Sequence, residues 1–138
     1  MKNQQLVSIL SKNFLIRLGV AVILLVHGMG GMFNNGVNNF GNLYLNQVGF
    51  APFGLVLAWA VKLSHVACAA ALLLNRYVVI NSIITIFILI TGIVMIHGKE
   101  GWFVVGGGRN GIEFNFILIL ILAQLSFDAY KMKKSWKD

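Results

Sequence analysis

The chain has 138 residues, of which 58% are hydrophobic and 11% are charged, whereas a soluble domain has roughly 45–50% and 25%. This composition excludes an ordinary soluble domain and indicates one integral membrane domain over residues 1–138. The net charge is +7, but most basic residues flank apolar runs, so we expect no nucleic-acid partner. The basic flanks follow the positive-inside rule and predict that both termini are cytoplasmic.

The first predicted span covers residues 14–33 and ends in the sequence HGMGGMF. No small-residue cleavage site follows this apolar run, so we interpret it as an uncleaved span rather than a signal peptide. Arg17 stands near the cytoplasmic end of the span, where we expect its side chain to snorkel to the lipid headgroups. The glycines of HGMGG allow a neighbouring helix backbone to come close.

An Asn- and Gly-rich loop follows, and within it residues 40–48 place apolar side chains at helical spacing. This pattern predicts a short amphipathic helix in the membrane interface. The second span covers residues 52–74 and has two ionisable residues, Lys62 and His65, near its middle. A lysine at this depth costs about 3 kcal/mol by insertion scales, so we expect Lys62 to face protein or a wet cavity.

Two further spans complete the predicted topology. The third covers residues 78–97 and ends at His97, and the fourth covers residues 112–130 and begins beside Glu113. The loop between them contains Trp102 and Phe103, which suit the outer membrane–water interface. The sequence therefore predicts an all-α integral membrane four-helix bundle with cytoplasmic N- and C-termini.

Five ionisable residues on these spans are the candidates for ligand binding or proton relay: His27, Lys62, His65, His97 and Glu113. At about 1.5 Å of rise per residue, His27, Lys62 and Glu113 fall in one layer in the outer half of the bundle. His65 falls one turn below this layer, and His97 falls at its outer end. We expect Lys62 and Glu113 to form an ion pair and the layer to line a cavity that opens outward.

Each of these residues also has a purely structural interpretation. The ion pair would then only fix helix register, and the histidines would be satisfied by hydrogen bonds in the core or at a helix end. The histidines do not indicate a metal site, because no two of them share a helix at a chelating spacing and no metal motif is present. We therefore expect no metal, and haem ligation is disfavoured for the same reason. The catalytic residues stay unassigned.

Four stretches of the sequence together resemble the DoxX family of small four-span bacterial membrane proteins. In chain order they are RLGVAVILLVHGMGGMF, GFAPFGLVLAWAVKLSHVACAAALLLNRY, ITGIVMIHGKEGW and GGGRNGIEFNFILILILAQ. In the last stretch Gly107, Gly108 and Glu113 resemble the family's entry to its final helix. Two features depart from the family pattern. The family usually has a Glu in the first half of span two, near His65, and often a Lys after HGMGG, which Lys62 could replace from another helix.

The resemblance implies a multi-pass protein of the bacterial inner membrane with a redox role, because the family is commonly described as oxidoreductases linked to quinone-coupled sulfur oxidation and redox stress. We therefore expect a quinone-interacting or accessory component of a redox system. Its partners would be the lipid bilayer and a membrane or periplasmic protein.

The sequence has no flavin, nicotinamide, iron–sulfur or c-type haem motif, so a redox role would depend on quinone, haem or a partner subunit. The cofactor, the oligomeric state and whether the chain is itself an enzyme stay open. The alternative is a non-catalytic membrane subunit or assembly factor. A small transporter and a haem-binding protein rank below it.

Overall fold

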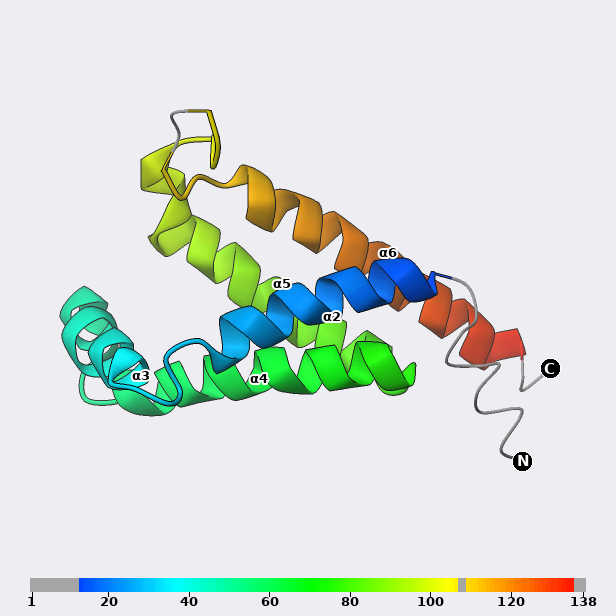
Figure 1. The fold of residues 1–138 in the computed structure, drawn as a ribbon, viewed down its shortest axis with the longest axis horizontal. Helices are drawn as coiled ribbons and strands as arrows, with labels where there is room; N and C mark the ends of the chain where they lie inside the picture. Colours follow the sequence, from blue (N-terminus) through cyan, green and yellow to red (C-terminus); the bar gives the residue numbers. More distant parts are fainter. Residues whose placement is uncertain (1–12, 107–108, 136–138) are drawn as a thin grey trace. The chain divides into compact units, whose positions relative to one another are not determined.

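The structure, a computed structural model, describes residues 13–106 and 109–135, and this part of the chain forms helices and turns without a strand (Figure 1). The predicted all-α fold is confirmed. Among the described residues, three helices are long and apolar enough to cross a membrane: α4 (Gly54–Leu74), α5 (Val78–Met95) and α6 (Glu113–Ser135). They are compatible with a membrane helical bundle. Gly107 and Gly108, named in the family resemblance, lie outside the described residues.

The helices belong to two compact units that divide between Arg76 and Tyr77. In the first unit α2 (Phe14–Met29) packs along α4, as the blue and green helices of Figure 1 show. The apolar helix α2 has 16 residues and ends before residue 33, the predicted end of the first span. The reason is local, because Gly30 has a ψ of 122° and Gly31 a φ of +83°. A positive φ is a conformation that glycine adopts without steric cost.

The contact between α2 and α4 is a regular seam of buried residues. Their positions recur at spacings of three and four, which is the pattern of helices packed like a coiled coil. Ala21, Gly28 and Cys68 are small residues in this seam, and small residues let two helix backbones come close. The buried residues that follow this spacing are Arg17, Ala21, Leu24 and Gly28 on α2, and His65, Cys68 and Leu72 on α4.

The segment between α2 and α4 forms the short helix α3 (Gly36–Asn38) and a π-helix, η1 (Asn39–Phe50). Residues 40–48, predicted as an amphipathic helix, lie within η1. Val37 and Leu45 pack against Ala58 of α4 in a small apolar cluster. The Oδ1 atom of Asn46 accepts a hydrogen bond of 2.9 Å from the Gly54 N–H, one of the donors that a helix start leaves without an intrahelical partner. This hydrogen bond and the apolar cluster hold η1 against the beginning of α4.

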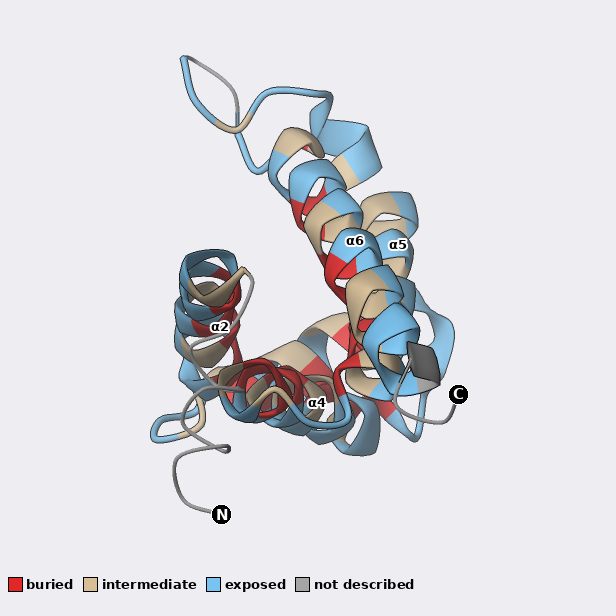
Figure 2. Ribbon diagram, turned by 90° about the vertical axis from the view of Figure 1, so that its right-hand side faces the viewer, coloured by how far each residue is buried: buried red, intermediate tan, exposed pale blue. Residues whose placement is uncertain are grey.

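The second unit is the pair α5 and α6, joined by a loop that contains the short 3₁₀ helix η2 (His97–Glu100). The buried residues between these two helices again recur at spacings of three and four, as in coiled-coil packing. Figure 2 shows buried residues, in red, on both α5 and α6. The buried residues of α5 include two with small hydroxyl side chains, and those of α6 include three leucines. The seam residues are Val78, Ser82, Thr85 and Leu89 on α5, and Asn115, Leu118, Leu122 and Leu125 on α6.

Candidate functional site

Lys62 lies beside the end of α2. Its Nζ atom donates a hydrogen bond of 2.8 Å to the backbone carbonyl oxygen of His27. That carbonyl is one of the last four of α2, which as a group lack partners within the helix. A cation near a helix C-terminus is also favoured by the helix dipole. Lys62 therefore satisfies and stabilises the end of a neighbouring helix, although it stands in the middle of an apolar one.

Arg17 makes the matching contact at the other end of the same helix pair. Its Nη1 atom donates a hydrogen bond of 2.9 Å to the carbonyl oxygen of Leu72, near the end of α4. The side chain is only 2% exposed. The prediction that Arg17 snorkels to the headgroups is therefore wrong. The polar group that the guanidinium needs is a carbonyl on the neighbouring helix, which sequence periodicity does not reveal.

His65 is buried in the α2–α4 seam, with 4% of its surface exposed. Its Nδ1 atom lies 2.7 Å from the carbonyl oxygen of Val61, one turn earlier on α4. A carbonyl only accepts hydrogen bonds, so Nδ1 carries a proton and donates. In the neutral ring Nε2 is then the unprotonated nitrogen, which can accept a hydrogen bond or bind a metal.

The His27 ring lies next to the His65 ring. Their centroids are 6.1 Å apart and the ring planes meet at 29°. Gly28 makes this approach possible, because a Cβ atom there would lie 3.1 Å from the Lys62 carbonyl oxygen and 3.2 Å from the His65 Cβ. The structure thus brings together three of the predicted site residues, His27, Lys62 and His65, in the first unit.

Glu113 begins α6 and holds the loop in front of it. One carboxylate oxygen accepts hydrogen bonds from the Val104 N–H at 2.7 Å and the Val105 N–H at 3.4 Å. The Glu113 backbone N–H donates to the Trp102 carbonyl at 3.0 Å. A carboxylate in the first turn of a helix is favoured by the dipole. Glu113 belongs to the second unit, and its ion pair with Lys62 stays a prediction, as does the outward-opening cavity.

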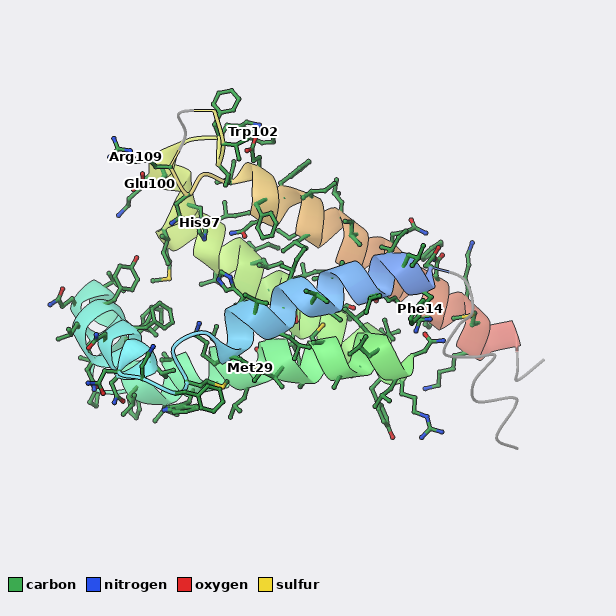
Figure 3. All side chains as sticks on the ribbon, viewed as in Figure 1. Phe14, Met29, His97, Glu100, Trp102 and Arg109 are labelled. Atoms are coloured by element: carbon green, nitrogen blue, oxygen red, sulfur yellow. The ribbon has the colours of Figure 1, made fainter. Side chains whose placement is uncertain are left out.

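His97 follows α5 in the same unit, in the part of the chain that also carries Glu100 and Trp102 (Figure 3). Its Nδ1 atom donates to the carbonyl oxygen of Asn110 at 2.7 Å. Its ring packs over Gly92, where a Cβ atom would lie 3.8 Å from the histidine Nε2 and 3.9 Å from the Asn115 amide nitrogen. Asn115 is 8% exposed. Sequence reasoning missed this buried amide, although it stands two residues after Glu113 on the predicted span.

The first unit offers both hydrogen-bond donors and a hydrogen-bond acceptor to a ligand. Lys62 offers N–H donors and neutral His65 an acceptor at Nε2, both among apolar side chains. All four acidic residues of the chain stand at position 100 or later, so no carboxylate of the first unit competes for these groups. Such a cluster suits a neutral ligand with polar oxygens.

Comparison with known proteins adds the family. The chain matches no curated protein and no solved structure. The family model of DoxX matches residues 13–98, a stretch that contains four of the five candidate site residues and ends before Glu113. Since this match covers more than half of the 138 residues, the chain, a membrane protein, belongs to the DoxX family.

Proposed function

We propose that this protein is a quinone-binding component of a redox system in the bacterial inner membrane. The quinone head group would contact the cluster of His27, Lys62 and His65. Two facts support the proposal. The chain is a membrane protein of the DoxX family, and the cluster is a group of polar side chains within a mainly apolar helix pair.

The observation that carries the proposal is the hydrogen bond from His65 Nδ1 to the Val61 carbonyl, beside the His27 ring and the Lys62 ammonium. A quinone presents carbonyl oxygens, which accept hydrogen bonds from Lys62. A quinol presents hydroxyl groups, which donate to the fixed Nε2 of His65. The same cluster can therefore hold both forms of the ligand. The two forms differ by two electrons and two protons; the redox partner would supply the electrons, and a histidine can help to exchange the protons.

The first test is an organic extract of the full chain purified in lipid nanodiscs, together with its visible spectrum. We expect a bound quinone in the extract and no haem absorption. The second test is quenching of tryptophan fluorescence by a short-chain quinone, since Trp59 stands one turn before Lys62 on α4. Saturable quenching is expected for the wild type.

Variants locate the site. Lys62→Met and His65→Asn each remove one polar contact, worth about 1–1.5 kcal/mol, so we expect about tenfold weaker quinone binding. His97→Asn is the matched control, because it removes an imidazole from the second unit. The proposal fails if the extract and the quenching show no quinone, or if all three variants bind it equally well.

A non-catalytic membrane subunit is the second candidate, and the pair of helix-end contacts favours it. Lys62 and Arg17 each donate a hydrogen bond to a backbone carbonyl near the end of the neighbouring helix. These hydrogen bonds give a structural reason for the presence of two charged side chains in apolar helices. This candidate predicts that Lys62→Met lowers the unfolding free energy while leaving any quinone binding unchanged. Binding that weakens without a change in stability would exclude it.

A further inference from the structure

A second group of polar side chains lies at the end of α5, in the second unit, and the proposed function does not use it. The His97 ring and the Asn115 amide come from different elements, and both lie over Gly92. A Cβ atom at Gly92 would lie 3.8 Å from the His97 Nε2 and 3.9 Å from the Asn115 Nδ2. Because glycine has no side chain, a space stays open between an imidazole and an amide.

The amide of Asn115 is buried without a partner in this part of the chain. Its side chain is only 8% exposed, and within residues 13–106 and 109–135 it forms no hydrogen bond. The large majority of buried polar side-chain atoms in proteins have a hydrogen-bond partner. A ligand that bonds to this amide would supply the partner that the described protein groups do not.

The two side chains offer opposite hydrogen-bonding roles to the same space. The Nδ1 atom of His97 donates to the Asn110 carbonyl at 2.7 Å, so in the neutral ring Nε2 has no proton and accepts a hydrogen bond. The Asn115 Nδ2 atom donates. A ligand carbonyl only accepts and an ammonium only donates, whereas a hydroxyl does both. One hydroxyl, or two adjacent hydroxyls of a polyol, therefore fits this pair.

The surroundings indicate that the hydroxyl belongs to a lipid headgroup. The apolar helix α5 ends at Met95, just before His97. In the loop that follows, Trp102 is 47% exposed and Phe103 is 62% exposed. Aromatic side chains beside the end of an apolar helix are typical of the membrane–water interface, the level at which lipid headgroups lie. We propose that His97 and Asn115 bind a headgroup hydroxyl of a lipid such as phosphatidylglycerol, seated over Gly92.

The inference goes beyond the proposed function and does not depend on it, because the two sites lie in different units and share no residue. A quinone presents only carbonyl oxygens, which cannot donate to the Nε2 atom of His97. Quinone binding therefore reports on the proposed function alone. Lipid binding measured without quinone reports on the hydroxyl site alone.

The test is native mass spectrometry of the full chain in a mild detergent, which counts the lipids bound to each chain. The protein is titrated with phosphatidylglycerol and, in parallel, with phosphatidylpropanol that has the same acyl chains. The two lipids carry the same charge, but phosphatidylpropanol lacks both headgroup hydroxyls. We expect one phosphatidylglycerol per chain to bind about tenfold more tightly than phosphatidylpropanol, the effect of about one hydrogen bond.

Variants locate the hydroxyl site. Gly92→Ala adds a methyl group that fills the space but meets its neighbours at the ordinary contact distances of 3.6 to 3.9 Å, so the chain should fold and bind both lipids equally. Asn115→Leu removes the amide at similar volume and should also lose the preference. Gly19→Ala on α2 is the matched control, because nothing lies within 4 Å of its added Cβ, and it should keep the preference.

Free glycerol separates a lipid ligand from a soluble polyol. At the same concentration as the lipid it should not displace phosphatidylglycerol, and displacement would overturn the assignment to a lipid. Far-UV circular dichroism of every variant checks that the helices are intact. The inference is also overturned if the wild type binds both lipids equally well, if the folded Gly92→Ala chain keeps the preference, or if Gly19→Ala loses it.

Discussion

The substitution Gly28→Ala tests the close approach of α2 to α4. A Cβ atom at this position would lie 3.1 Å from the Lys62 carbonyl oxygen and 3.1 Å from a Val66 methyl group, so α4 must give way by a few tenths of an ångström. Overpacking costs about 1–3 kcal/mol, and alanine gains about 1 kcal/mol over glycine in a helix. We expect a net destabilisation of about 0–2 kcal/mol, and more for Gly28→Val.

Gly19→Ala is the matched control on the same helix, since nothing lies within 4 Å of a Cβ atom there. It should stabilise the protein by up to about 1 kcal/mol. The assay is unfolding of the detergent-solubilised chain by a denaturing detergent, followed by far-UV circular dichroism. The packing argument is refuted if Gly28→Ala stabilises the protein as much as Gly19→Ala does.

Three further predictions address topology, the buried arginine and the loop. In a chain without the native cysteine, Asn42→Cys should react with a membrane-impermeant thiol reagent in intact cells, whereas Ser135→Cys should not; the reverse pattern would contradict the cytoplasmic C-terminus. Arg17→Met should lower the unfolding free energy by about 1.5–3 kcal/mol, the range for a charged hydrogen bond, while Arg76→Met at an exposed position should change it by less than about 0.5 kcal/mol. Glu113→Ala should speed amide hydrogen exchange about tenfold or more in the loop before α6, because its backbone donors lose a carboxylate worth about 1.5–3 kcal/mol; unchanged exchange would show that the carboxylate does not hold the loop.

The fold class was predictable because apolar length and charge placement are properties of the sequence itself. The positions of the helix ends were harder to predict from the sequence. The first span was predicted through residue 33, whereas α2 ends at Met29, because a run of apolar residues does not show which glycine leaves the helix. The start of α4 depends on a side chain eight residues earlier, Asn46, and neither propensity nor periodicity predicts such a cap.

The candidate site was predictable as a set of residues but not as a set of contacts. A lysine in an apolar helix must find a polar partner, and side-chain spacing indicates only other side chains. The partner of Lys62 in the first unit is a backbone carbonyl of His27, and every residue carries one of those. The stacking of His27 on His65 likewise depends on the register of two helices.

The two cation contacts of the α2–α4 pair limit how these helices can move. His27 stands ten residues after Arg17 on α2, and Lys62 stands ten residues before Leu72 on α4, so the two contacts lie about 15 Å apart along the seam and obey one antiparallel register. A piston-like sliding of α2 by a single residue would break both hydrogen bonds together, at a cost of about 3–6 kcal/mol for two charged hydrogen bonds. Rotation at the glycines after Met29 breaks neither contact. The segment that follows α2 can therefore turn at these glycines without a shift of the helix along its axis.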